Sequence, residues 1–592
     1  TMDNDAYMTV STSTSDIRVD ANLTMNGTSG VRNTGGATTF IRFRGNSSNT
    51  ISCNTPANSS SARVVMGNAS FNYTLNSDWQ IAYLQLSNSG GAGATIAVAD
   101  GNTLTVDGDI NAYHTSINLT LSGSGSLDCN GSIASGSVIT MGTGILSIAT
   151  NFTNDHTFTD GAGTVTFDGS ANSVIDDPDG IEFYNLTINK DATDDVVSCN
   201  DADADITVSN NLTITEGTLS TTDADLSVTG TTTLTDGKLI AAEGATTAKT
   251  TLTGDLTMNN DAILDDQTSI TTASTDAIDL YGSLDLNGTS SITSTTLSSA
   301  TINLRGGTKT INAEVGVTCS LADMNFYEDY TIQDNWTVRG LYAWSSTGVI
   351  TVADGFTVTA DDLYNNADGT ITLNGSGSLT ITDDAWLCIE SGTTFTMNTG
   401  TVDIADRLQI GSGANGTFNG NTGTIQVGGN LVMSGTINEG NSTFELDGSV
   451  NQNISGTTVK WHDLVIKNTS GDVGLNADGT VNGTLTMTTG DLIIATGVTL
   501  TSDGTDAPGF SGGSASSHIV TSGTGVISDT YASTTKVTYP IGDGTNYRPV
   551  ALTPSSATSG PLTVVVIPLL QISTPVAPFN VVLSLVDVIS RL

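Results

Sequence analysis

The sequence predicts an all-β protein, a right-handed parallel β-solenoid (β-helix) that is followed by a small C-terminal β module. Three observations lead to this prediction. A stretch of more than two hundred residues is written twice, the two copies differ by one coil-sized insertion, and short apolar–polar bursts alternate with glycine-containing turns. Length that changes in whole units is typical of a stack of coils.

The duplication is direct and long. Residues 2–6 return as residues 258–262, an offset of 256 (258 minus 2). Residues 168–172 return as residues 447–451, an offset of 279 (447 minus 168). The two offsets differ by 23 (279 minus 256), and the extra stretch falls in the second copy between Leu408 and Asp447. One jump of this size predicts one added coil rather than a lengthened loop.

The short segments of alternating apolar and polar residues are predicted to be strands with one face directed into the core. Residues 104–106, 186–188 and 371–373 alternate apolar and polar side chains, and Asn-Gly, Asp-Gly or Ser-Gly turns follow such bursts. Helical periodicity is absent, so we expect almost no helix. Like residues recur at coil spacing, which favours parallel over antiparallel pairing. At roughly 22 residues per coil, about 20 to 24 coils would form a rod of about 100 Å or more.

We predict three regions: copy one at 1–256, copy two at 257–505 and continuous with the first, and a C-terminal β module at 506–592. Of the 10 prolines, only Pro56 and Pro178 precede residue 507, which indicates uninterrupted sheet before that point. The apolar tail 561–592 would add two or three strands to the module, cap the solenoid or pair with a neighbouring molecule. It could also be an artefactual end of the reading frame. Its prolines exclude a membrane helix. Because Thr1 is no initiator and no signal peptide is visible, we expect a processed chain or a fragment.

The charge narrows the classes of partner. The chain has 17 Lys plus Arg against 60 Asp plus Glu, a net charge of -43. Such a surface repels nucleic acid and anionic membranes and attracts divalent cations and basic partners. The five cysteines have no cysteine counterparts in the other copy, so we predict lone buried thiols rather than a disulfide framework.

Metal binding is a second possible source of chemistry. Carboxylates stand at alternate positions at Asp201, Asp203 and Asp205, and around a turn at Asp176, Asp177 and Asp179. Hard oxygen ligands with these spacings suit calcium. The alternative is that both runs are solvated acidic turns, since neither recurs in the second copy. No other cofactor is expected, and calcium is not required by the fold.

Catalysis is not predicted. A polysaccharide lyase or hydrolase on a β-helix needs clustered carboxylates beside a cation or a histidine. The four histidines, His114, His156, His462 and His518, are scattered along the chain. Sequence signatures of nucleophilic, zinc-dependent or phosphate-binding sites are absent.

Two further patterns have competing interpretations. Trp79 and Trp336 are equivalent in the two copies, and we expect core packing, with a sugar-stacking platform as the alternative. Thr-x-Thr triplets, as at 103–105 and 484–486, raise the alternative of ice binding. That function requires such triplets in register on every coil, and their spacing along the sequence is irregular.

Residues 538–550, which read Thr-Tyr-Pro-Ile-Gly-Asp-Gly-Thr-Asn-Tyr-Arg-Pro-Val, are distinctive, as are the related blocks 183–188 and 461–466. The pattern resembles the closing module of large, repetitive secreted surface proteins of Bacteroidota-type bacteria. The resemblance implies secretion and surface display. Proteins of this class usually end in a sorting domain for the type IX export route, and this sequence shows no such domain.

These observations predict an extracellular structural protein of a bacterial surface: a rigid stalk, an adhesin or a filament subunit. Its expected partners are other copies, met end to end or through the tail 561–592, or surface glycans and proteins. We expect no nucleic acid partner and no membrane span. The alternatives are a carbohydrate-active β-helix enzyme and an ice-binding protein.

Overall fold

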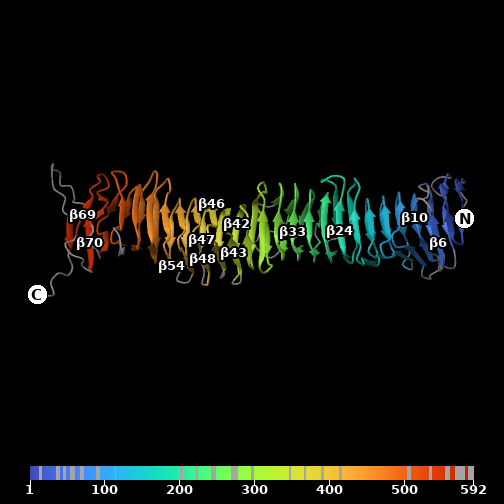
Figure 1. Cartoon of the computed structure of the whole chain (residues 1–592), viewed down its shortest axis with the longest axis horizontal. Coiled ribbons are helices and arrows are strands. Elements are labelled where there is room, and N and C mark those ends of the chain that lie inside the picture. The colour runs from blue at the N-terminus through green and yellow to red at the C-terminus, as the bar shows by residue number, and fades with distance from the viewer. Residues whose placement is uncertain are drawn as a thin grey trace. The chain divides into compact units, whose positions relative to one another are not determined.

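The protein is described by a computed structural model of the whole chain (Figure 1). The structure describes all residues except 12–16, 35–39, 45–47, 54–60, 67–71, 88–93, 114, 116, 200–204, 222–223, 242–247, 268–277, 295–298, 346–347, 366–368, 389–391, 413–415, 503–508, 532–535, 554–559, 567–580 and 585–592. The chain divides into two compact units. The first unit comprises Thr1–Ile302 and Val315–Leu321, and the second comprises Asn303–Glu314 and Ala322–Leu592.

The first unit is a stack of coils with three strands each. One coil consists of β11 (Ala94–Val98), β12 (Thr103–Val106) and β13 (Ile110–Ala112). These strands pair in parallel with the strands of the next coil, β14 (Ile117–Leu121), β15 (Ser126–Cys129) and β16 (Ile133–Ser135). The ladder that includes β13 and β16 is a 13-stranded sheet from β2 (Ile17–Val19) to β37 (Ser291–Thr293). At about 4.8 Å per strand, it extends for about 60 Å.

The second unit repeats this arrangement. Its strands β48 (Thr394–Thr396), β49 (Thr401–Ile404) and β50 (Leu408–Ile410) form one coil. They pair in parallel with β51 (Thr417–Asn419), β52 (Thr424–Val427) and β53 (Leu431–Met433). The described residues contain no helix. The predicted parallel β-solenoid is therefore confirmed, while the hand of the coil stays a prediction.

The insertion of the second copy is one complete coil. Leu408 is the register partner of Leu431, and the stretch that separates them equals the jump in offset between the copies. The strands between them, β51 and β52, are register partners of β48 and β49 with the same spacing. The added residues form a rung of the stack and do not bulge from it, as the sequence predicted.

Alternate residues of each strand fill a narrow core. In β48, Phe395 is fully buried between the two outward threonines, and its ring lies 5.6 Å from that of Phe418 one coil later, nearly parallel at 6°. Inward side chains at register positions of successive coils, such as Phe395 and Phe418, thus stack along the axis and are shielded from water. The turns stack as closely: a Cβ at Gly400 would lie 1.9 Å from the carbonyl oxygen of Gly377. Only glycine allows this approach.

Corner residues with short polar side chains connect successive coils. A side-chain oxygen of one coil accepts a backbone N–H of the next in both units. The pairs include Asp78 to Thr103 at 2.9 Å, Asp354 to Ser376 at 2.7 Å, Asn430 to Asn453 at 2.8 Å and Asp478 to Thr499 at 2.7 Å. Asp and Asn are the residues that make such bonds with nearby backbone. Part of the acidic composition is therefore structural.

The parallel stack continues beyond residue 505. Strands β64 (Phe510–Gly512), β65 (Ile519–Thr521) and β66 (Val526–Tyr531) pair in parallel with β61 (Leu485–Thr489), β62 (Leu492–Ile494) and β63 (Thr499–Ser502). Pro540 does not interrupt this stack because it lies in a turn, where its carbonyl accepts the Ile519 N–H at 2.8 Å. Parallel pairing therefore continues past residue 506, and the module boundary at that residue stays a prediction.

Antiparallel pairing begins only at the final strands. Strand β66 pairs on its other edge with β70 (Gly560–Val566), which pairs with β71 (Val581–Ser584), whereas the short strand β68 (Ile541–Gly542) still pairs in parallel with β65. Strands β67 (Val537–Tyr539) and β69 (Val550–Leu552) form a separate antiparallel pair. The described part of the tail therefore adds two strands that cover one edge of the last coil; the rest of 561–592 lies outside the described residues.

Candidate functional site

Four aromatic side chains line one outward face of the second unit. Tyr342 of β42 (Trp336–Ala343), Tyr364 of β44 (Thr357–Asn365) and Trp386 of β47 (Ala385–Leu387) are successive register partners. Trp344 directly follows β42 and is 37% exposed, whereas the other three are half-buried. We call Tyr342, Trp344, Tyr364 and Trp386 the aromatic column.

The rings of the aromatic column are close neighbours in a row. Ring centroids lie 6.2 Å apart between Tyr342 and Trp344, 6.0 Å between Trp344 and Tyr364, and 5.5 Å between Tyr364 and Trp386. The first pair is nearly parallel at 18°, and the other two are tilted by 45° and 49°. Such contacts between aromatic rings stabilise the sheet.

The backbone under the aromatic column is rigid. The inward neighbours Leu341, Leu363 and Leu387 are each 1% exposed and anchor the three strands in the core. Gly340 leaves room for the Tyr342 ring, since a Cβ there would lie 2.3 Å from that ring. The indole N–H of Trp344 donates a hydrogen bond to Asn325 Oδ1 at 2.9 Å, which orients its ring.

Carboxylates gather at the corner beside the aromatic column. We call this group the acidic corner: Asp361, Asp362, Asp383, Asp384 and Asp406. Among the described residues, Asp383, Asp384 and Asp406 form the one group of three whose ligand atoms lie within 4.8 Å of one another. Burial and the neighbouring Asp383 raise the pKa of the Asp362 carboxyl, and Arg339 partly opposes the rise.

Arginines partly balance this charge. The Arg407 guanidinium lies 3.0 Å from Asp384 and 5.0 Å from the centre of the Trp386 ring, so it joins the acidic corner to the aromatic column. Arg339 forms an ion pair with Asp323 beneath Tyr342. Burial, with Asp323 and Asp362 adding to it, raises the pKa of the Tyr342 hydroxyl to about 12, so this phenol is neutral at physiological pH.

The first predicted calcium run is a hydrogen-bonded turn. Asp177 is 5% exposed, and its carboxylate accepts the Asn154 amide at 2.7 Å and the Asp179 N–H at 3.2 Å. Desolvation nevertheless raises its pKa. Asp176 is half-buried and Asp179 is exposed. Among the described residues, these three do not form a group of converging ligands, so calcium binding at this turn stays a prediction.

Of the second run, only Asp205 belongs to the described residues. Asp201 and Asp203 lie outside the described residues. Asp205 is exposed, and its carbonyl accepts the Ile181 N–H at 2.9 Å, next to the turn at Gly180. Asp205 therefore lies one coil after the turn that contains Asp176, Asp177 and Asp179.

The duplicated tryptophans belong to the core. Trp79 is 2% exposed and Trp336 is 3% exposed, which confirms the packing interpretation and excludes them as a sugar-stacking platform. All five cysteines are buried and none is part of a disulfide, as predicted. Burial raises the pKa of Cys129 and Cys388 to about 12, so these thiols are not nucleophiles at neutral pH.

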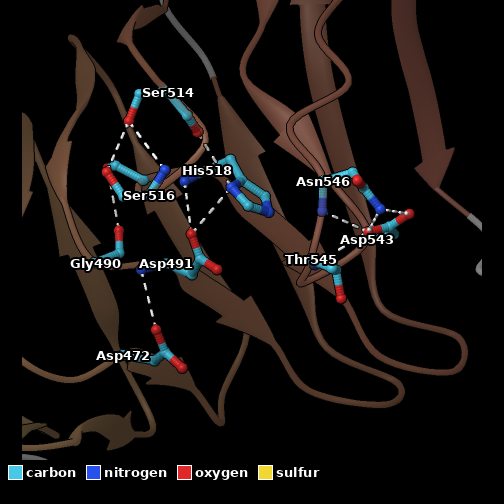
Figure 2. Close-up of polar contacts among 10 residues, drawn as sticks. Asp472, Gly490, Asp491, Ser514, Ser516, His518, Asp543, Thr545 and Asn546 are labelled. Atoms are coloured by element: carbon cyan, nitrogen blue, oxygen red, sulfur yellow. Dashed lines mark hydrogen bonds and ion pairs between the residues drawn. The ribbon is translucent and has the colours of Figure 1, made fainter.

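His518 is the centre of a second polar cluster, shown in Figure 2. Its Nδ1 lies 3.1 Å from Asp491 Oδ1, and the same oxygen accepts the His518 N–H at 2.9 Å. The hydroxyls of Ser514 and Ser516 lie 3.2 Å from each other. The ring Nε2 is buried, and a Cβ at Gly542 would lie 2.5 Å from it. A catalytic triad needs a serine hydroxyl at that nitrogen. The contacts that His518 does make, with Asp491, connect two successive coils.

Threonines form a regular array on another face of the second unit. Thr370, Thr394, Thr417 and Thr436 are register partners on four successive coils, although the intervals between them along the sequence are unequal. A parallel column contains Thr372, Thr396, Asn419 and Asn438. We call these eight residues the threonine face. The irregular sequence spacing therefore conceals a regular array, contrary to our expectation.

No protein-family model, curated protein or solved structure matches this chain. Within the described residues, no helix is both long enough and apolar enough to cross a membrane.

The aromatic column was not predicted from the sequence. Its signal was the interval between aromatic residues, because Tyr342, Tyr364 and Trp386 recur at equal steps along the sequence. Each step is one coil, so aromatic residues repeating at it on outward positions must stack on one face. The duplicated tryptophans Trp79 and Trp336 were the more visible pattern, but they are kept in both copies because they pack in the core.

Proposed function

We propose that this chain is an extracellular structural protein of a bacterial surface, acting as a stalk or an adhesin, with no catalytic step. The observation that supports this role most strongly is the run of in-register parallel ladders within each unit. Each coil is held by its two neighbours, so stiffness grows with the number of coils and does not depend on one large core.

The surface of the protein supports the same role. Polar corner residues satisfy backbone N–H groups between coils, and the net charge of -43 keeps the long surface soluble. The resemblance of residues 538–550 to closing modules of secreted surface proteins favours surface display. Identical rungs also offer repeated weak contacts, which act together by multivalency.

Localisation tests this proposal. Antibodies raised against the purified protein would be applied to intact cells of the source organism and to fractionated lysates. We expect labelling of the intact cell surface and recovery from the outer membrane or the medium. Labelling that requires permeabilised cells, with recovery from the cytosol, would contradict the proposal.

The threonine face supports a second candidate function, ice binding. Two columns of hydroxyl and amide groups, spaced about 4.8 Å along the ladder, form an ordered array. Thermal hysteresis and ice recrystallisation would be measured for the wild type and for a T394Y/T417Y variant. A T359Y/T380Y variant, altered on a neighbouring face, is the matched control. Inhibition that only the first variant loses would favour this candidate, and no inhibition by the wild type would exclude it.

A further inference from the structure

We propose that the aromatic column and the acidic corner form a binding surface for a neutral polysaccharide chain, which runs along the stack axis. The inference gives a ligand class to the adhesive role on which it rests. All the residues involved belong to the second unit.

The first support is the geometry of the aromatic column. Sugars present C–H groups from one ring face, and these pack against the electron-rich face of an aromatic ring. Tyr342, Tyr364 and Trp386 lie on three successive coils, Trp344 lies beside Tyr342 on the first of them, and neighbouring ring centroids are 5.5 to 6.2 Å apart. A polysaccharide could therefore place successive units on successive rings, whereas a single sugar would use only one ring.

The second support is the position of the hydrogen-bonding groups. Asp383 and Asp406 are exposed at the edge of the aromatic column, and Arg407 connects this edge to Trp386. Carboxylates accept and guanidinium groups donate hydrogen bonds, so together they match the hydroxyls of a sugar chain. A few directed polar groups beside a stacking surface are the usual composition of a ligand site.

The third support is charge. Asp361, Asp362, Asp383 and Asp406 lie at the corner beside the aromatic column, and the whole chain has a net charge of -43. An anionic polysaccharide or nucleic acid would be repelled from this surface. A neutral polysaccharide has no such penalty, and its hydroxyls can donate to the carboxylates.

Stacking within the sheet is the alternative explanation of the aromatic column, because cross-strand aromatic pairs stabilise β-structure. This explanation does not require Trp344, which follows β42, is 37% exposed and is oriented by Asn325. A ring placed outside the strand and held with its surface partly in solvent is better explained by a ligand.

Binding of defined polysaccharides by the full chain tests the inference. The probes are insoluble β-glucan and chitin in pull-down assays, soluble neutral glucans and mannans in calorimetry, and an acidic polyuronate as the charged comparison. We expect retention on at least one neutral polysaccharide and none on the polyuronate. The W344A/W386A variant should bind the polysaccharide about tenfold more weakly than the wild type, or not at all.

The Y113A variant is the matched control, because Tyr113 is an aromatic residue with 64% exposure in the first unit, apart from the aromatic column. It should bind as the wild type does. Circular dichroism and the melting temperature verify that each variant is folded, and W386F keeps a smaller ring if W386A does not fold. Equal binding by W344A/W386A, no binding by the wild type, or preference for the polyuronate would overturn the inference. Release of soluble sugar fragments would overturn a binding-only role and favour the carbohydrate-active enzyme.

The two proposals fail separately. Polysaccharide binding by a protein that is found in the cytosol would contradict the surface role and leave this site intact. Surface labelling without polysaccharide binding would contradict the site and leave the structural role intact.

Discussion

Lys190 and Asn468 occupy equivalent positions in the two copies. Each contributes to a network that supplies hydrogen bonds to buried carbonyl oxygens, but the donor is an ammonium group in one copy and side-chain amides in the other. Lys190 is 3% exposed, and its ammonium donates to the carbonyls of Ala149 (2.9 Å) and Asp168 and to the Ser173 hydroxyl (2.8 Å). In the second copy, Asn468 donates to Gln452 at 2.8 Å, and Gln452 reaches the carbonyls of the preceding coil at 2.7 Å.

This relationship predicts a compensated exchange. Lys190→Met removes the donor and leaves buried carbonyls unpaired, which should lower the free energy of unfolding by about 1 to 3 kcal/mol for each carbonyl. The double variant K190N/S173Q installs the pair found in the second copy and should be more stable than K190N alone. Urea denaturation measures both effects. If K190M were as stable as the wild type, the ammonium would have no structural role.

The added coil predicts that a whole rung can be removed. Because Leu408 and Leu431 are register partners, deletion of residues 408–430 joins Arg407 to Leu431 with every remaining strand in register. The shortened protein should fold cooperatively with only a small change in melting temperature. Deletion of 408–418 removes about half a coil and turns inward residues outward, so it should not fold. Equal stability of the two deletions would argue against stacking in register.

Stability should depend on pH in two opposite ways. Desolvation raises the pKa of Asp177 and Asp447, so their contribution is present below the ordinary value of 3.8 and is lost as the pH rises through the raised pKa. Hydrogen bonds from Ser124 and Ser376 lower the pKa of Asp100 and Asp354, so their contribution is present above 3.8 and lost below it.

We therefore expect the melting temperature to rise as the pH falls from neutral and to drop at strongly acidic pH. Melting curves between about pH 3 and pH 8 measure this profile. The D177N/D447N variant should flatten the upper part of the profile, and D100N/D354N the lower part. A profile that rises steadily towards alkaline pH would be inconsistent with these carboxyl groups.

Divalent cations should stabilise the protein mainly by screening its charge. With a net charge of -43, calcium and magnesium should raise the melting temperature by similar amounts at equal concentration, and chelation should reverse both effects. A rise with calcium alone that is lost in the D383N/D406N variant would instead indicate a specific site at the acidic corner. The same comparison with D176N/D179N tests the calcium run predicted from the sequence.

Much of the fold could be predicted, because a solenoid repeats its physical requirements in every coil. Alternating residues such as those of β48 identified the strands, and the offset between the copies identified the extra coil. The register of the threonine face could not be predicted, since turns of different length separate Thr394, Thr417 and Thr436. Pairing between strands keeps the threonines in register although the turns differ in length. The sequence alone does not show which turns contain the extra residues.

The candidate site was harder to predict than the fold. Duplication directed attention to Trp79 and Trp336, which are copied because the core needs them. The aromatic column occurs in one copy only, so comparison of the copies cannot find it. The acidic corner was hidden for a related reason: Asp383 and Asp406 lie a full coil apart in the sequence and meet only when coils stack.

Distances along one ladder test the central claim most directly, that coils stack in register through parallel strands. Thr105, Thr166 and Thr257 lie on the same outward column of the first unit. Thr105 is seven rungs from Thr257, and Thr166 is four rungs from Thr257. Nitroxide labels at residues 105 and 257 should be about 34 Å apart by pulsed electron resonance, and labels at 166 and 257 about 19 Å apart, with the buried cysteines replaced. Two narrow distributions that differ by about 15 Å would agree with the stack. Broad distributions, or equal distances for the two pairs, would contradict it.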